Sequence, residues 1–302
     1  EGDNLKVSEV YQLRDGTFPC ATSKYEKRNI ADQVPKWNKE NCIQCTQCSL
    51  VCPHAAIRPF IVLETDKYAD QGIKVLGNLN DKYIICVSEA DCTGCGLCIN
   101  TCPGKGGNKA LSFGNYDSNK QVIANDLFNN YENKTDENRF TVKGSQLTKP
   151  LFEFSGACAG CGETPYIKLL TQLFGKKLVI ANATGCSSIY GGSVPSTPYS
   201  IPWANSLFED NAEFSLGILL GYESQRERAK ELIKQTMDSF DYDTKKLLTE
   251  WLENPDDYEK TKLVKENLRQ QNLPKELSEE LEYLSAKSIW AVGGDGWAYD
   301  IG

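Results

Sequence analysis

Eight of the thirteen cysteines form two runs with identical spacing, a pattern in which thiols bind metal. Both runs read C-x2-C-x2-C-x3-C-P, with Pro53 and Pro103 after the last cysteine. This spacing wraps two cubic [4Fe-4S] clusters, so it predicts that electron transfer is part of the work of this protein. The first run is Cys42, Cys45, Cys48 and Cys52, and the second is Cys92, Cys95, Cys98 and Cys102.

The spacing also predicts which cysteines share a cluster. Thiolates are soft ligands that suit iron and sulfur, and in two-cluster chains the fourth cysteine of each run serves the other cluster. We expect Gly94 and Gly96 to let backbone amides approach the cluster sulfides. One cluster is then expected on Cys42, Cys45, Cys48 and Cys102, and the other on Cys92, Cys95, Cys98 and Cys52.

Structural zinc and disulfides are the alternatives for these cysteines. Zinc is usually held by pairs of C-x2-C rather than by triplets with a fourth cysteine before proline. Disulfides need an oxidising compartment, and the sequence shows no secretory signal peptide. Iron–sulfur binding is therefore the favoured interpretation.

Composition narrows the class of protein further. The chain has 302 residues, enough for about two domains, and no apolar run of 18 residues, so we expect no membrane span. The formal net charge of −8 argues against a nucleic-acid surface. The single histidine, His54, makes a histidine-based active site improbable, and we expect it to be a neighbour of a cluster.

The predicted organisation is an α+β two-cluster ferredoxin-like domain followed by an α/β parallel-sheet domain. We expect a connector over residues 1–35 with Cys20 buried, the cluster domain over 36–115, a surface linker over 116–150 and the α/β domain over 151–302. Apolar runs predict strands at 60–63 and 83–87, with Cys86 as a core residue in the second.

The second half alternates between helix and strand patterns. Thr164-Pro165 predicts a helix start and Gly175 its end, followed by a buried parallel strand at 178–181. Residues 213–221 predict a buried helix with close packing at Gly217 and Gly221. Charged helical segments over 223–285, broken near Asp241, Pro255 and Pro274, lead to a strand at 288–292.

Two further motifs in this half have residue types that suit cofactor binding. Cys158, Cys161 and Cys186 provide three thiols, which fit a zinc site, a redox pair or part of a third cube equally well. Gly294-Asp295-Gly296 follows the last predicted strand, where glycine amides can meet phosphate oxygens and a carboxylate can hold Mg²⁺. A Gly-Asp-Gly is also a common turn, so on its own it is a weak indication.

Together these residues resemble pyruvate:ferredoxin oxidoreductase, also called pyruvate:flavodoxin oxidoreductase. The resemblance covers nearly the whole chain. It rests on both cysteine runs and on several longer segments. These are residues 24–28 (KYEKR), 156–165 (GACAGCGETP), 183–191 (ATGCSSIYG), 203–213 (WANSLFEDNAE) and 293–302 (GGDGWAYDIG).

The resemblance implies roles for particular residues. It implies that the two runs form a medial and distal cluster domain, and that Cys158, Cys161 and Cys186 are three ligands of a proximal cluster beside thiamine diphosphate. It implies that Glu163 and Cys186 line this cofactor and that Asp295 is a ligand of its Mg²⁺. Gly294, Gly296 and Trp297 would form the rest of the diphosphate loop, and no residue here is implied to be catalytic.

The family's activity is the oxidation of pyruvate with coenzyme A to acetyl-CoA and CO2, with electrons passing to ferredoxin or flavodoxin. The resemblance further implies a homodimer and a cytoplasmic location, or a hydrogenosomal one in an anaerobic protist. The fourth proximal ligand and the other Mg²⁺ ligands are expected after Gly302, and the pyruvate-binding residues before Glu1. We therefore expect a segment of a larger enzyme that is inactive alone.

Three alternatives remain open. The chain could belong to a pyruvate:NADP⁺ oxidoreductase, in which a flavin reductase domain follows the same core. It could belong to a related oxidoreductase for another 2-oxoacid. It could also be a two-cluster electron-transfer module without catalysis, which predicts about eight irons and no affinity for thiamine diphosphate.

Overall fold

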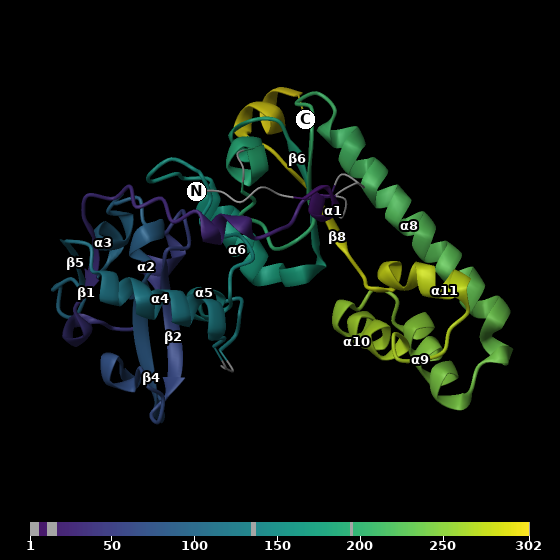
Figure 1. Ribbon diagram of the computed structural model, residues 1–302, viewed down its shortest axis with the longest axis horizontal. Helices are drawn as coiled ribbons and strands as arrows, with labels where there is room; N and C mark the ends of the chain where they lie inside the picture. Colours follow the sequence, from purple (N-terminus) through teal and green to yellow (C-terminus); the bar gives the residue numbers. More distant parts are fainter. Residues whose placement is uncertain (1–5, 11–16, 134–136, 194–195, 302) are drawn as a thin grey trace. The chain divides into compact units, whose positions relative to one another are not determined.

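The computed structural model describes residues 6–10, 17–133, 137–193 and 196–301 (Figure 1). It comprises two compact units, of which unit 1 is residues 1–173 with 189–200, and unit 2 is residues 174–188 with 201–302. Residues 1–5 and 11–16 of the expected connector, and Gly302 at the end of the expected α/β domain, lie outside the described residues. The domain limits expected from the sequence stay predictions.

Unit 1 repeats one short local structure in its two cysteine runs. Helices α2 (Gln47–Leu50) and α3 (Leu97–Thr101) begin at equivalent positions, each after a residue in the left-handed conformation. Strand β1 (Val34–Trp37), before the first run, pairs antiparallel with β5 (Leu111–Gly114), after the second. This pairing joins the outer ends of the two runs and closes the repeat.

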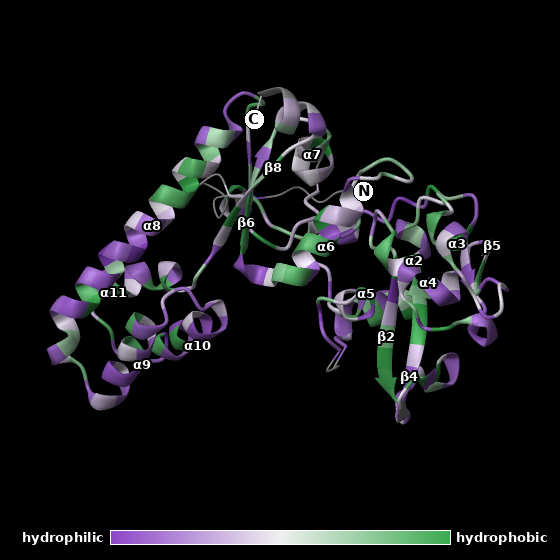
Figure 2. Ribbon diagram, turned by 180° about the vertical axis from the view of Figure 1, so that it is seen from behind, coloured by the Kyte–Doolittle hydropathy of each residue, from purple (hydrophilic) through white to green (hydrophobic). Residues whose placement is uncertain are grey.

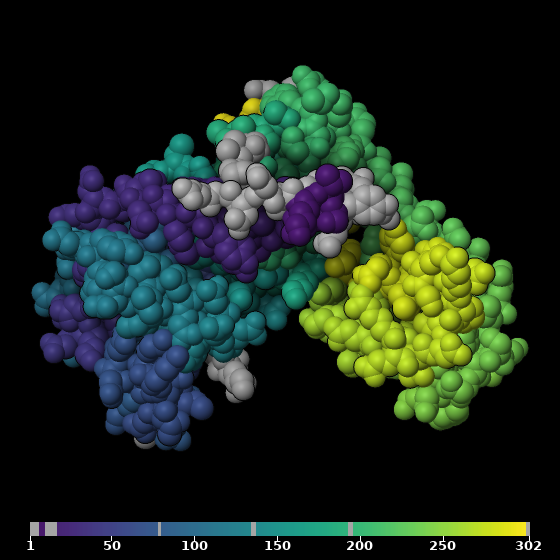
Figure 3. Space-filling model, viewed as in Figure 1, coloured from purple at the N-terminus to yellow at the C-terminus, as the bar shows by residue number. Residues whose placement is uncertain are grey.

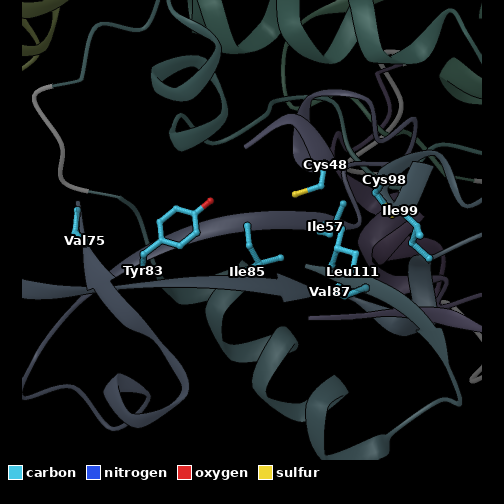
Figure 4. Close-up of a cluster of buried hydrophobic side chains, with 9 residues drawn as sticks. All are labelled: Cys48, Ile57, Val75, Tyr83, Ile85, Val87, Cys98, Ile99 and Leu111. Carbon is cyan, nitrogen blue, oxygen red and sulfur yellow. The ribbon is translucent and has the colours of Figure 1, made fainter. Parts of the chain in front are cut away.

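The antiparallel sheet β2–β4–β3 separates two cores in unit 1. Strand β2 (Ile57–Leu63) pairs with β4 (Asn78–Val87), which also pairs with β3 (Ile73–Val75). Side chains alternate across a strand, so Ile57, Ile85 and Val87 lie on the face that packs with Cys48 and Cys98 (Figure 4). Phe60, Ile84 and Cys86 lie on the opposite face. The predicted strands at 60–63 and 83–87 are confirmed, and Cys86 is a core residue on the face opposite the cysteine runs.

Residues 116–150, expected to form a surface linker, contain two helices. Helix α4 (Ser118–Asn130) starts at Asp117, whose carboxylate accepts the Asn119 N–H at 3.0 Å, and it buries Leu127 completely. Helix α5 (Val142–Leu147) buries four of its six residues. The sequence pattern concealed α4 because most of its other residues are asparagine, aspartate, serine and lysine, several of which favour turns.

Helix α6 (Thr164–Phe174) starts and ends as predicted. Thr164 is its first residue, Pro165 follows, and Gly175 with φ 62° terminates it. A glycine accepts this left-handed conformation without the steric cost of a Cβ atom. The short helix α1 (Val7–Val10) also belongs to unit 1.

Unit 2 is built on the parallel sheet that the sequence predicts. Strand β6 (Leu178–Ala183) lies between β7 (Trp203–Ser206) and β8 (Ser288–Val292), and both neighbours run parallel to it. Leu178, Ile180 and Ala181 are fully buried, as expected for the central strand of a covered parallel sheet. The short helix α7 (Cys186–Ser188) follows β6.

Four helices form a second core in unit 2. They are α8 (Asn211–Thr236), α9 (Tyr242–Glu253), α10 (Tyr258–Leu268) and α11 (Lys275–Glu280). Their apolar stripes meet around Ile233, Leu248 and Trp251, and hydrophilic and hydrophobic residues alternate along the helices (Figure 2). The space-filling view shows α9, α10 and α11 packed as one body (Figure 3). The predicted breaks near Asp241, Pro255 and Pro274 are confirmed.

The predicted close packing at Gly217 and Gly221 is wrong. Both glycines are exposed, and a Cβ atom on either would meet nothing within 4 Å. Leu216 and Leu220 beside them are 53% and 55% exposed. An apolar helical run therefore did not indicate burial within this chain.

Among the described residues, no helix combines the length and hydropathy of a membrane span.

Trp251 provides a test of the helical core. It is 2% exposed, and its indole N–H donates to the Leu284 carbonyl at 2.7 Å. We expect Trp251→Ala to lower the free energy of unfolding by about 3–5 kcal/mol, because it leaves a cavity and an unpaired carbonyl. Urea unfolding followed by circular dichroism measures this. Tyr242→Ala, at a side chain 79% exposed, is the control, and equal small losses in both variants would contradict the assigned packing.

Candidate functional site

The cysteine runs line two small cavities in unit 1. Cys42, Cys45, Cys48 and Cys102 line one cavity together with Trp37, Tyr83 and Ile85. Cys52, Cys92, Cys95 and Cys98 line the other, together with His54, Ile57 and Val87. Each cavity thus receives three cysteines from one run and one from the other. The role of these thiols as ligands stays a prediction. None of the thirteen cysteines, all of which lie in the described residues, forms a disulfide.

Left-handed backbone conformations bend both runs around their cavities. The pairs Gln44 and Gly94, and Thr46 and Gly96, occupy equivalent positions, and all four have φ between 57° and 76°. The Gly94 amide donates to the Cys92 sulfur at 3.4 Å. Amide donors at ligand sulfurs are one means by which proteins set cluster potentials. The first run reaches the same geometry with non-glycine residues, at a conformational cost.

Burial in the apolar cavities favours the protonated form of four of the eight thiols. Burial raises the pKa of Cys92 to about 12 and raises the pKa values of Cys48 and Cys98 well above the usual range. Burial also raises the pKa of Cys42, partly offset by the Gln44 backbone amide. A dry, sulfur-lined cavity with amide donors fits a cluster, because its sulfides and thiolates need hydrogen bonds but no hydration.

A clasp of basic residues, which the sequence interpretation missed, lies next to the second cavity. Lys27 pairs with Asp91 at 2.5 Å, immediately before Cys92. Arg28 donates to the Ser155 carbonyl at 2.9 Å, three residues before Cys158. These two side chains link the second cysteine run to the Cys158 segment. Cys20, expected to be buried, is exposed.

His54 connects the end of the first cysteine run to the Cys158 segment. It is 2% exposed, and its Nδ1 lies 3.1 Å from the Ser155 carbonyl. The Phe154 amide donates to the His54 carbonyl at 2.9 Å. Burial lowers the pKa of His54, so the ring is neutral at pH 7. It therefore packs beside the cavity as an uncharged residue.

A buried lysine that the sequence interpretation also missed lies near both cavities. Lys168, on α6, is 1% exposed and donates to backbone carbonyls at the end of α2. Burial lowers its pKa to about 8, so the amine still carries its charge at pH 7. Its sequence distance from the cysteine runs left no local pattern that could have revealed this contact.

Cys158 and Cys161 form a tight turn beside the second cavity. The Cys161 amide donates to the Cys158 carbonyl at 3.1 Å, and Gly160 between them has φ 75°. A Cβ atom at Gly160 would lie 3.8 Å from the Cys95 Cβ. The two thiols of this turn therefore belong next to the cavity that Cys95 lines. Cys186 belongs to unit 2.

Glu163 faces a group of buried aromatic residues in unit 1. Tyr190 and Tyr199 are 4% and 0% exposed, and both rings pack edge-on against Phe152. Burial raises the pKa of both tyrosines, and the Glu163 carboxylate raises each further. Both tyrosines are therefore neutral hydroxyls beside a carboxylate.

The predicted diphosphate loop lies at the carboxyl edge of the unit 2 sheet. Parallel strands end at one edge, so Thr184–Cys186 after β6 and Gly293–Trp297 after β8 share it. A Cβ atom at Gly293 would lie 2.6 Å from the Trp297 ring, so only glycine fits there. At Gly294 a Cβ atom would meet nothing within 4 Å, and Asp295 is exposed. An open glycine amide beside an exposed carboxylate fits a diphosphate with its Mg²⁺.

One buried asparagine holds this edge together. Asn211, fully buried at the start of α8, donates to the carbonyls of Ala181 in β6 at 3.4 Å and Val292 in β8 at 3.3 Å. Its side-chain oxygen accepts the Ser206 hydroxyl of β7 at 3.1 Å. Asn211 thus fixes the ends of all three strands from which the loop projects.

The described residues contain no group of three or more histidine, cysteine, aspartate or glutamate side chains close enough to hold a single metal ion.

Comparison with known proteins identifies the relatives of this chain. Residues 41–105 match the model of a 4Fe-4S double cluster binding domain, and residues 1–31 match a domain of unknown function. Over its full length, the chain is 46% identical to the pyruvate-flavodoxin oxidoreductase of Enterobacter agglomerans. It is 45% identical to the pyruvate:ferredoxin oxidoreductase of Moorella thermoacetica. The chain is homologous to a segment of the pyruvate:ferredoxin (flavodoxin) oxidoreductases.

The match covers all of this chain but only part of each oxidoreductase. The chain spans 28% of the length of the Enterobacter and Moorella proteins. It spans 27% of a probable pyruvate-flavodoxin oxidoreductase of Escherichia coli, at 42% identity. The predicted resemblance to these oxidoreductases is confirmed, and these bacterial relatives give no support to a hydrogenosomal location.

The raised thiol pKa values predict a pH dependence for cluster assembly. Thiolate is the ligand, and a thiol with pKa about 12, such as Cys92, is almost fully protonated at pH 7. Below that pKa, each pH unit raises the thiolate fraction about tenfold, so we expect assembly to release protons and to speed up from pH 7 to 9. Anaerobic reconstitution followed by visible absorbance measures this, and a rate that falls with pH would contradict it.

Proposed function

We propose that this chain is the electron-transfer and thiamine-diphosphate-loop segment of a pyruvate:ferredoxin oxidoreductase. The whole enzyme would oxidise pyruvate with coenzyme A to acetyl-CoA and CO2 and reduce ferredoxin or flavodoxin. The observation that carries this proposal is the grouping of eight cysteines in two cavities, in a chain related to these enzymes over its full length. The homodimer and the cytoplasmic location belong to the same proposal.

In this proposal, each cavity holds one [4Fe-4S] cluster. Cys42, Cys45, Cys48 and Cys102 would bind one, and Cys52, Cys92, Cys95 and Cys98 the other. The Cys158–Cys161 turn would contribute two ligands of a third cluster, with Cys186 as another. Because this turn lies beside Cys95, the cluster on Cys95 would receive electrons first, and the cluster on Cys42 would pass them to the acceptor.

The carboxyl edge of the unit 2 sheet would hold the diphosphate. When bound, thiamine diphosphate supplies the stabilisation of a carbanion next to the substrate carbonyl. Asp295 would bind its Mg²⁺, and the amides of Gly294 and Gly296 would donate to phosphate oxygens. Trp297 would keep the loop closed through its contact with Gly293, and Glu163 would line the cofactor.

Iron counting in the whole protein tests the cluster assignment. We expect Cys45→Ala to lower the iron content by about four atoms per chain, because one cube loses a ligand. Cys86→Ala is the control, since Cys86 is a buried cysteine that faces away from the cavities, and it should keep all the iron. Equal iron contents in the two variants, or zinc in place of iron, would refute the assignment.

Asp295 tests the thiamine diphosphate loop independently of the clusters. In the whole protein, Asp295→Ala should weaken Mg²⁺–thiamine diphosphate binding at least about tenfold, because the metal loses an anionic ligand. Titration calorimetry measures the affinity, and the visible cluster absorption should not change. Asp238→Ala, at an exposed aspartate on the surface of unit 2, is the control. Unchanged affinity in Asp295→Ala would argue against this role, whatever the iron content.

A further inference from the structure

Lys168 is a buried cation on α6 whose ammonium group lies at the end of α2, near the predicted ligands Cys48 and Cys52. Its side chain is 1% exposed, although it projects from α6, more than 115 residues after the first cysteine run. Its ammonium group donates to the carbonyl of Ser49, and to those of Leu50 and Cys52 at 3.1 Å each. The three N–H groups of the amine therefore all donate to the backbone between Cys48 and Cys52.

The ion pairs of the described residues give Lys168 no carboxylate partner within 4.0 Å. Arg58, also buried in this unit, differs in that it pairs with the Glu153 carboxylate. The groups that favour the charged form of Lys168 are the thiols of Cys52 and Cys48. These two cysteines belong to the two different cavities. A buried charge needs a compensating charge nearby, and here only the cluster ligands provide it.

We propose that Lys168 is the fixed counter-charge shared by the two clusters and that it raises their reduction potentials. The proposal rests on the cluster assignment made above. On reduction, each cluster gains one electron and no bond forms or breaks, so the cluster becomes more negative. A buried positive charge favours that form, because little water lies between the charges to screen them. The amine stays protonated in both redox states.

The second cysteine run contains a natural comparison. Lys109 donates to the carbonyls of Ile99 at 2.7 Å and Asn100 at 3.0 Å. In the repeat, these positions are equivalent to Ser49 and Leu50, so one lysine caps each short helix at the same place. Lys109 is exposed, and water should screen its charge. The two lysines thus make equivalent hydrogen bonds but differ in burial. Comparing their variants therefore distinguishes the effect of capping a helix from the effect of a buried charge.

A redox titration of the whole protein, followed by electron paramagnetic resonance at pH 7 with dithionite as reductant, tests the proposal. Lys168→Gln removes the charge but keeps an amide donor, and Lys168→Arg keeps the charge. In Lys168→Gln, we expect the reduced-to-oxidised ratio at a given potential to fall about tenfold, a midpoint shift of about −59 mV for a one-electron couple. Lys168→Arg and Lys109→Gln should stay close to the parent protein.

Iron content, measured on the same samples, separates this proposal from the cluster assignment. If the parent protein lacks iron, the assignment of the clusters fails. If Lys168→Gln keeps its iron and its potentials match the parent, the counter-charge proposal is overturned while the assignment stands. If Lys168→Gln loses its clusters and Lys168→Arg keeps them, the charge is required and the proposal is supported. Loss of the clusters in both variants, or an equal shift in Lys109→Gln, would overturn it in favour of a packing or capping role.

Discussion

Each cavity draws three sulfur atoms from one cysteine run and the fourth from the other, and the rest of unit 1 depends on this crossing. Because the lining of each cavity comes from both runs, the two runs pack against each other. The pairing of β1 with β5 closes the outer ends of the repeat, and the β2–β4 sheet supplies one apolar wall. The left-handed residues at equivalent positions bend both runs inward. Such a module gains its cohesion from the cofactors that it encloses.

The surroundings of the cavities come from distant parts of the chain. Lys27 and Arg28 contact the segments before Cys92 and before Cys158, while His54 joins the end of the first cysteine run to the segment before Cys158. Lys168 reaches the first run from α6. These contacts hold the Cys158–Cys161 turn beside Cys95. They also give the Glu-Lys-Arg sequence at residues 26–28, within a region that matches a domain of unknown function, a physical role as a clasp.

The features that the sequence predicted correctly depend on local information. The cysteine spacing, the alternation in the strands, the Thr164-Pro165 start and the breaks at Asp241 and Pro274 are all short-range signals. The failures concern tertiary contacts. Helix α4 is rich in residues that favour turns, but Leu127 and Phe128 pack on the sheet and stabilise it. Gly217 and Gly221 lie in an apolar run, yet nothing in the described chain packs on them.

The same limit applies to the functional residues. Spacing was enough to group the eight cysteines and to pick out Gly294–Gly296, because these motifs are contiguous. Spacing could not reveal Lys168, Asn211 or the tyrosines around Glu163, since each acts through partners far away in sequence. Their chemistry is visible only once burial and hydrogen bonding are known, because an isolated lysine or asparagine is usually a solvated surface residue.

X-ray absorption spectroscopy of the anaerobically purified protein, at the iron, zinc and sulfur edges, tests the central claim most directly. Thiolate ligands around cubic clusters predict an iron signal with a first shell of sulfur and a second shell of neighbouring iron atoms. They also predict the absence of stoichiometric zinc. A zinc signal with four sulfur neighbours and no metal shell, or a sulfur-edge spectrum of disulfides without iron, would contradict the account.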